Sequence, residues 1–455
     1  MKHCDAAWFY DTPSVKRRMF EADWQAAHTA NRNALLKFIL RHDDDAGVDL
    51  DGDGVPDEVQ ETAEALWEVH DLLYGTFDFY AALSDRDPFT ISQKSWSLFV
   101  SDFNLEEARS KLCTKSHLDQ LFVASDTNAD EIVPLAKGAV KQAGSQTLNR
   151  QEFLQVIVRV AVTKHVLTSR ATDDVSDAVS MLVRRDLAPR VPRECEQDSN
   201  AFRRRQCYTE AVDAALRAHE PSLRVLYRQY AAGQGLVKAT EADRQAARRE
   251  LLGLDEWRKF VTDLRLMDHV LTPRLVTLVF VWSRMRVVDE VKRRVRLTNH
   301  HFEDFLESLV RVAVIKPWPS AEEIRQAGCL DAGHFIIKLQ SELAAQEGTE
   351  AVGGTGKEPR TCYDEWCEAR RRPSYDSEPE LPVAVCVAQL LSYIFNVIEG
   401  STNSAGAHDL NISQREASLF YNNGIGTNAV AAARPELLLQ RVEQSRARPL
   451  RTQGR

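Results

Sequence analysis

The sequence NRQEFLQVIVRVAV occupies residues Asn149–Val162, and it recurs at Phe302–Val314 as FEDFLESLVRVAV. Both copies contain an acid directly before a phenylalanine, the run Val-Arg-Val-Ala-Val and a later lysine, all in the same register. Apolar residues in both copies return at the period of a helix with one buried face. Because a duplicated pattern constrains architecture more than a single motif does, we expect two copies of one helical block.

A second repeated segment lies upstream of each copy. SWSLFVSDFNL at Ser95–Leu105 matches EWRKFVTDLRL at Glu256–Leu266. A predicted helix with matching apolar positions precedes each of them, at Leu73–Ala82 and at Leu223–Ala232. Each copy is therefore predicted to contain two helix-loop-helix units.

The ends of the predicted loops follow one positional pattern: an apolar residue, an acid four positions later, and then an aromatic residue. Three units largely comply, with serine replacing the acid in the first: Ile91, Ser95 and Trp96; Leu148, Glu152 and Phe153; Leu252, Glu256 and Trp257. The fourth keeps Asp304 and Phe305 but shifts its apolar residue to Leu297. In these positions the chain resembles the EF-hand superfamily. The resemblance implies paired helix-loop-helix units whose loops meet through their apolar residues.

The predicted fold is all-α. It consists of two EF-hand-like helix-loop-helix pairs joined by a helical connector, with a C-terminal helix and a flexible tail. In chain order we predict an N-terminal helix with an acidic calcium-type loop (1–66), the first pair (67–166), the connector (167–217), the second pair (218–317), a helical extension (318–346), a flexible linker (347–382), an apolar helix (383–399) that is either a lid or a docking element, and a loose tail (400–455).

The clearest chemical signal is the run DLDGDGVPDE at Asp49–Glu58, after a helix predicted at 23–41. Carboxylates at alternate positions point inward when a backbone curls around a hard cation, and Gly54 permits the sharp turn. Aspartates this close repel one another, so the loop is either an open solvated turn or is neutralised by a divalent cation. We adopt a Ca²⁺ site, whose predicted ligands are Asp49, Asp51, Asp53, Val55 through its carbonyl, Asp57, Glu58 and Glu61.

This loop departs from the EF-hand pattern at Pro56 and Gln60, which occupy its eighth and twelfth positions. The run instead resembles the Asp-rich calcium loops of thrombospondin type 3 and dockerin-type repeats, which implies that Glu58 or Glu61 completes the coordination shell. A second, weaker candidate loop offers Asp126, Asn128, Asp130 and Glu152. An insertion separates its last residue from the others, so the alternative is a polar surface loop.

Composition and missing motifs exclude several classes of function. The chain has no Gly-rich phosphate loop, nucleophile elbow or His-Glu-x-x-His helix, so we expect no enzymatic activity. A net charge of -9 disfavours nucleic acid as a partner. The first residues lack the pattern of a secretory signal, so we expect a cytoplasmic protein. The apolar run Val383–Ile398 is shorter than a bilayer span, so we expect no membrane span.

Eight scattered cysteines suggest free thiols, with zinc binding by Cys362, Cys367 and Cys386 as the alternative. The repeated Asp102 and Asp263 are expected to cap helix ends or to pair with the repeated Arg159 and Arg311. The aromatic stripe of the repeats is expected to form a closed core rather than a target groove, because only five methionines are present.

The predicted function is therefore a non-catalytic calcium-binding adaptor or scaffold with protein partners. Much of the chain, from Asp5 to Ile315, also resembles long EF-hand-like proteins of ciliated and flagellated single-celled eukaryotes, through FDFY at 77–80, WSRMRVVDE at 282–290 and the Val-Arg-Val-Ala repeats. That resemblance implies a cytoskeletal or axonemal location in a cilium or flagellum. The alternative function is a calcium-responsive sensor that regulates an enzyme or motor, and a more remote one is an enzyme without a recognised motif.

Overall fold

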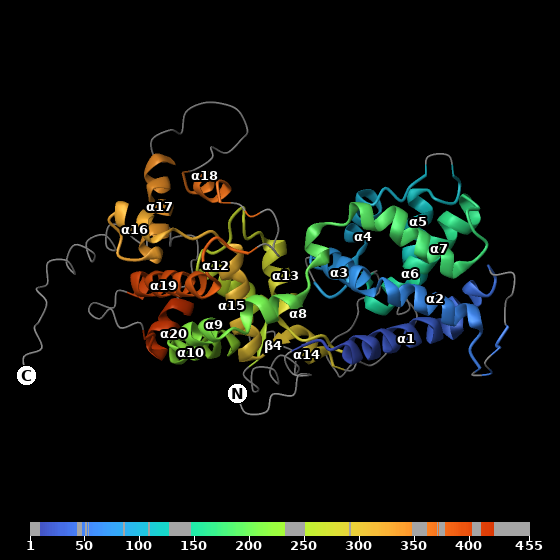
Figure 1. Cartoon of the computed structure of the whole chain (residues 1–455), viewed down its shortest axis with the longest axis horizontal. Helices are drawn as coiled ribbons and strands as arrows, with labels where there is room; N and C mark the ends of the chain where they lie inside the picture. Colours follow the sequence, from blue (N-terminus) through green and yellow to red (C-terminus); the bar gives the residue numbers. More distant parts are fainter. Residues whose placement is uncertain are drawn as a thin grey trace, which may run out of the picture. The chain divides into compact units, whose positions relative to one another are not determined.

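A computed structural model describes residues 10–42, 48–50, 52, 54–84, 87–107, 110–126, 147–232, 251–290, 293–347, 362–370, 372, 378–402 and 411–422. The described residues form an all-α structure, in which strands contribute two short antiparallel sheets (Figure 1). The chain divides into two compact units. Unit 1 contains Met1–Asp198 and Met285–Thr298, and unit 2 contains Ser199–Arg284 and Asn299–Arg455.

Unit 1 contains both helix-loop-helix elements of the first repeat. Its elements are α1 (Pro13–Ile39), α2 (Asp57–Glu68), α3 (His70–Ala81), β1 (Ile91–Ser92), α4 (Gln93–Asp102), α5 (Lys115–Ser125), β2 (Thr147–Leu148), α6 (Arg150–Ala161), η2 (Val162–Thr168), α7 (Val175–Met181), η3 (Leu182–Leu187), η4 (Ala188–Arg190), η5 (Arg193–Glu196) and α14 (Arg294–Thr298). The first helix begins earlier than predicted, because Thr12 caps it and Pro13 suits its first position.

Unit 2 contains the second repeat and the C-terminal helices. Its elements are α8 (Ser199–Phe202), η6 (Arg203–Cys207), α9 (Glu210–Arg217), α10 (Glu220–Ala231), β3 (Leu252–Gly253), α12 (Leu254–Asp263), α13 (Pro273–Ser283), β4 (Asn299–His300), α15 (Phe302–Ile315), α16 (Ala321–Gln326), α17 (Ala332–Glu347), α18 (Cys362–Glu368), α19 (Val383–Thr402) and α20 (Gln414–Asn422). The segment predicted as one connector, 167–217, thus contributes to both units.

The two loops of each repeat pair through a two-stranded antiparallel sheet. In unit 1, Ile91 lies opposite Leu148, as the positional pattern predicted. In unit 2, Leu252 lies opposite His300, so the prediction of Leu297 as the fourth pairing residue is wrong. Leu297 is instead buried in unit 1, because the segment 285–298 belongs to that unit.

His300 fits this apolar position because it is neutral there. Its Nε2 atom lies 2.8 Å from the Phe280 carbonyl oxygen, and its ring stacks on that of Phe280 at 3.7 Å between centroids. Burial lowers the pKa of His300 to about 3. The imidazole therefore donates one hydrogen bond and otherwise packs as an aromatic ring.

The aromatic stripe of each repeat forms a buried core. Trp96 stacks on Phe99 in unit 1, and Trp257 stacks on Phe260 in unit 2. The repeated carboxylates lie beside these cores and accept hydrogen bonds from tyrosines, Asp102 from Tyr80 and Asp263 from Tyr230, each at 2.7 Å. The prediction that they pair with Arg159 and Arg311 is wrong, because a tyrosine of the preceding helix lies within reach of each carboxylate.

Two segments predicted to be irregular contain short helices. Helix α18 lies within the predicted linker and packs against α17, and α20 lies within the predicted tail and packs against α10 and α19. Their apolar positions, such as Phe420 and Cys367, are buried, but each run is too short to show a clear helical period in sequence.

Helix α19 (Val383–Thr402) is long and apolar enough, by length and composition alone, to cross a membrane. It is longer than the sequence suggested. Most of the span Val383–Gly400 is nevertheless buried inside the structure, where α19 packs against α9, α15, α17 and α20. The helix thus lies in the core of unit 2.

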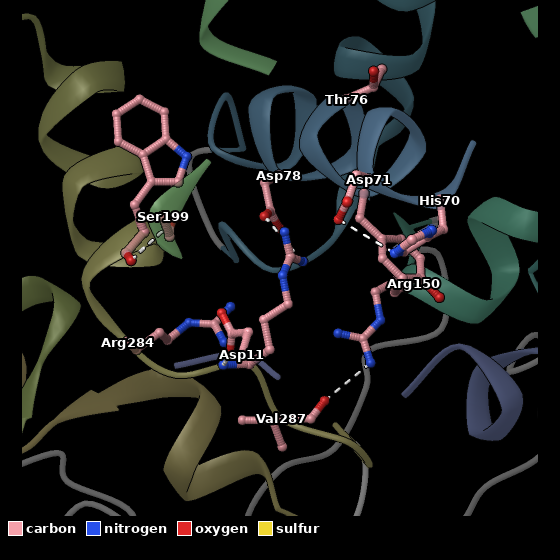
Figure 2. Close-up of polar contacts among 12 residues, drawn as sticks. Asp11, His70, Asp71, Thr76, Asp78, Arg150, Ser199, Arg284 and Val287 are labelled. Atoms are coloured by element: carbon pink, nitrogen blue, oxygen red, sulfur yellow. Dashed lines mark hydrogen bonds and ion pairs between the residues drawn. The ribbon is translucent and has the colours of Figure 1, made fainter. Parts of the chain in front are cut away.

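Residues 285–298, which we call the strap, are held in unit 1 by a buried arginine of α6. Arg150 donates from Nε and Nη2 to the carboxylate of Asp23 at 2.5 and 3.1 Å, and from Nη1 to Glu290 at 2.9 Å. Its Nη2 also donates to the Val287 carbonyl at 3.1 Å, a bond visible in Figure 2. The Asp11 carboxylate accepts a hydrogen bond from the backbone N–H of Arg286 at 2.8 Å.

The repeated arginines, Arg159 and Arg311, differ in whether a carboxylate lies beside them. In unit 2, Arg311 donates to Glu307 one turn earlier, at 2.7 Å, and Arg203 donates to the same carboxylate at 2.9 Å. In unit 1 the matching residues are Arg159 and Gln155, and Arg159 has no ion pair with any described residue. Its described contact is with the Phe38 ring, 4.9 Å away, and burial lowers the pKa of its guanidinium.

We predict that replacing Glu307 by glutamine and replacing Gln155 by glutamate change the stability of the protein in opposite directions. Glu307→Gln removes the carboxylate shared by two buried arginines, and it should cost about 3–5 kcal/mol of unfolding free energy. Gln155→Glu supplies Arg159 with a counter-ion, and it should raise the stability of unit 1. Hydrogen exchange of the α6 and α15 amides reports each unit separately. Destabilisation by Gln155→Glu would contradict this account of Arg159.

A second prediction concerns acid stability. Because the folded protein keeps His300 neutral down to a pKa of about 3, while the unfolded chain protonates near 6.5, stability is lost as the pH falls below about 6.5. His300→Leu, which copies the Leu148 position, should remove about 2 kcal/mol of the stability difference between pH 8 and pH 5. Urea unfolding at both pH values measures this difference, and His301→Asn, at an exposed neighbouring position, is the control. An unchanged pH dependence in His300→Leu would be inconsistent with a buried neutral imidazole.

Candidate metal centre

The acidic loop before α2 is curled by hydrogen bonds from its own backbone. The Asp49 carboxylate accepts from the N–H groups of Gly52 at 2.8 Å and Gly54 at 3.0 Å. Both glycines have positive φ angles, +73° and +88°, which other residues adopt at a cost. Asp57 closes the loop by accepting from the N–H of Leu50 at 3.2 Å. The local geometry is therefore a tight turn set by two glycines.

The predicted ligands of this loop are only partly described by the structure. Asp51 and Asp53 lie outside the described residues, so their role stays a prediction. Asp49, Val55 and Asp57 are described and lie in the curled turn. Glu58 lies in the first turn of α2 and Glu61 in the second. Both belong to the cluster of carboxylates described next.

A cluster of three carboxylates lies where α2 packs against α7. It contains Glu58, Glu61 and Asp174, and one oxygen from each lies within 4.8 Å of the others. Glu58 is buried, Asp174 is half-buried and Glu61 is exposed, so the cluster is open to solvent on one side. Asp174 could not be recognised as a ligand from the sequence, because no sequence pattern indicates that α7 packs against α2.

Two of these carboxylates also cap the N-terminus of α7. Asp174 accepts from the N–H of Asp177 at 2.7 Å and from the Ser176 hydroxyl at 2.8 Å. Glu58 accepts from the N–H of Ser176 at 3.1 Å and from the Thr62 hydroxyl at 3.1 Å. The positive end of the α7 dipole thus offsets part of the repulsion between the carboxylates.

The chemistry of this donor set suits a hard divalent cation. All three side chains provide oxygen, which both Ca²⁺ and Mg²⁺ prefer. Three carboxylates at this separation repel one another, and a divalent cation would neutralise most of that repulsion. Because Glu61 is exposed, an ion could keep several waters on that side.

In the second predicted calcium loop, Glu152 caps a helix. Glu152 is fully buried and forms a capping box at the start of α6, where its carboxylate accepts from the N–H of Asn149 at 2.8 Å. Asp126 is buried just after α5, whereas Asn128 and Asp130 lie outside the described residues. The capping bond occupies one Glu152 oxygen, and an ion at this loop stays a prediction.

The cysteines considered for zinc are free thiols in the structure. Burial raises the pKa of Cys367 and of Cys386 to about 11, which opposes the thiolate form that zinc requires. Cys362 is exposed on α18. These residues do not form a metal-ligand cluster among the described residues.

Comparisons with known proteins leave the function to be argued from these residues. No family model matches the sequence, no curated protein matches it, and no solved structure matches the chain.

The capping role of Asp174 can be separated from its charge. Asp174→Ala should destabilise unit 1 by about 1 kcal/mol in metal-free buffer, because it removes the α7 cap. Asp174→Asn should cost much less, because asparagine caps a helix as well as aspartate does. Thermal unfolding in the presence of a chelator measures both variants. Equal losses for alanine and asparagine would show that the charge, and not the cap, matters without metal.

Proposed function

We propose that this protein is a non-catalytic, calcium-binding adaptor that belongs to the EF-hand superfamily and has mostly lost its loop ligands. The observation that carries the proposal is the cluster of Glu58, Glu61 and Asp174, because it joins two helices through carboxylates. A cation bound there would stabilise the contact between α2 and α7. The adjacent Asp49–Glu58 loop would supply further oxygens from the same region of the chain.

Support for a degenerate EF-hand ancestry comes from the loop pairing. In each unit two helix-loop-helix elements meet through a two-stranded sheet, at Ile91 with Leu148 and at Leu252 with His300. Glu152 and Asp304 keep the acid that closes an EF-hand loop, but each accepts a hydrogen bond from the backbone at the start of its helix. The acids thus serve as caps, which preserves the shape of the loop without an ion.

An adaptor is favoured over a sensor by the state of the aromatic cores. Trp96, Trp257 and their neighbours are buried, and the described repeats are closed around them. A sensor opens such a core on binding calcium, whereas a structural ion only tightens it. We further propose protein partners and, from the resemblance to proteins of ciliated cells, a cytoskeletal location.

Calorimetric titration with Ca²⁺ tests the proposed site. The wild type should bind, and Asp174→Asn should weaken binding about tenfold or more, because it removes one ligand charge while keeping the cap. Asp177→Asn is the matched control, since it removes the same charge from the same turn of α7 outside the cluster. Equal affinity of wild type and Asp174→Asn would exclude this site.

The same titration distinguishes an adaptor from a sensor. We expect Ca²⁺ to raise the thermal stability of the protein without exposing Trp96 or Trp257, as followed by tryptophan fluorescence and by binding of a hydrophobic dye. Calcium-dependent dye binding with a shift of the tryptophan emission would favour the sensor instead.

A further inference from the structure

Unit 1 contains a cavity of about 400 Å³ between helix α1 and the strap. One wall comes from α1, and the other comes from Met285–Asp289, Arg293 and Arg296 of the strap. Its volume lies within the range of cavities that hold small molecules. The acidic cluster of the candidate metal centre contributes none of its residues to this cavity.

Four arginines line this cavity, together with one carboxylate, that of Asp289. The arginines are Arg18 of α1 and Arg286, Arg293 and Arg296 of the strap. Arg18 and Arg293 form no ion pair with any described residue, and Arg286 lies 3.8 Å from its nearest ion-pair partner, Asp78. The chain has a net charge of -9, so its composition alone predicts a mostly negative surface. Positive charge is instead concentrated around this cavity.

The remaining lining is apolar. Val15 of α1 and Met285, Val287 and Val288 of the strap contribute to the walls. Inorganic phosphate would use the guanidinium groups but would leave these side chains uncovered. A ligand that matches the whole cavity therefore has an anionic end and an apolar or ring-shaped body.

The strap wall is held in place before any ligand arrives. Arg150 donates to the Val287 carbonyl, as Figure 2 shows. The Asp11 carboxylate accepts from the Arg286 N–H, so the strap backbone is held at two successive residues. Glu290, bound to Arg150, holds the strap a few residues further on. A preorganised wall reduces the entropy lost on binding.

We propose that this cavity binds a small phosphate-bearing ligand with a planar aromatic ring, of the nucleoside phosphate class. Guanidinium groups match phosphate oxygens by paired hydrogen bonds, and several of them favour a ligand with more than one phosphate. The valines and Met285 pack against the ring. Binding joins α1 to the strap and so stabilises this part of unit 1.

Calorimetry of the full-length protein with ADP, in buffer without divalent cations, tests the proposal. ADP should bind, pyrophosphate should bind more weakly, and adenosine should bind least. Pyrophosphate lacks the ring that packs against the apolar side chains, and adenosine lacks the phosphates that the arginines bind. Arg18→Gln and Arg293→Gln should each weaken ADP binding about tenfold or more, since each removes a charged hydrogen-bond donor. Both residues are exposed, so the variants should fold, which circular dichroism checks.

Arg184→Gln is the matched control, because Arg184 is an exposed arginine of unit 1 outside the cavity. Val288→Phe narrows the cavity without changing its charge, and it should weaken ADP more than pyrophosphate. Failure of ADP to bind the wild type would overturn the proposal. So would equal weakening by Arg184→Gln and Arg293→Gln, which would indicate a general attraction of polyanions to the surface.

Discussion

The interaction on which unit 1 depends is the buried ion pair between Arg150 and Asp23. Removing either partner would leave a charge in the protein interior, so a buried pair of this kind needs further hydrogen bonds to its polar atoms. Arg150 meets that condition by binding α1 through Asp23 and the strap through Glu290 and Val287. Tyr74 of α3 donates to the same Asp23 carboxylate at 2.8 Å. The Arg150–Asp23 pair therefore links α6 to α1, to α3 and to the strap.

Unit 2 also contains a buried arginine, Arg203 of η6, that binds a carboxylate of the second repeat. Arg203 is fully buried and donates to the carbonyls of Trp282 and Arg284 at 3.1 Å, while Glu307 neutralises it. Those carbonyls lie at the end of α13, where helical hydrogen bonding stops. The chain between Trp282 and Glu290 is thus bound by an arginine at each end, and each arginine belongs to the unit in which that end lies.

The sequence was sufficient for the helices of the two repeats and for three of the four pairing positions, because these depend on local periodicity. It was insufficient wherever a residue is defined by packing between distant segments. Leu297 follows the apolar pattern of a pairing residue, yet the strap carries it into unit 1, and His300 pairs because burial keeps it neutral. Asp174 has the ordinary signal of a helix cap, and only the packing of α7 on α2 brings it near Glu58.

The strap lies in the loop between α13 and α15 of the second repeat, and its sequence opposes cation binding. A loop that begins Arg284-Met285-Arg286 cannot hold a divalent cation at its first positions, because like charges repel. This loop instead places Leu297 in the core of unit 1 and carries Arg293 and Arg296 beside the cavity. The short β3–β4 pairing survives because it needs only backbone hydrogen bonds and two buried side chains. The two repeats thus share the same pairing of their loops, although this loop carries arginines where a cation site would need carboxylates.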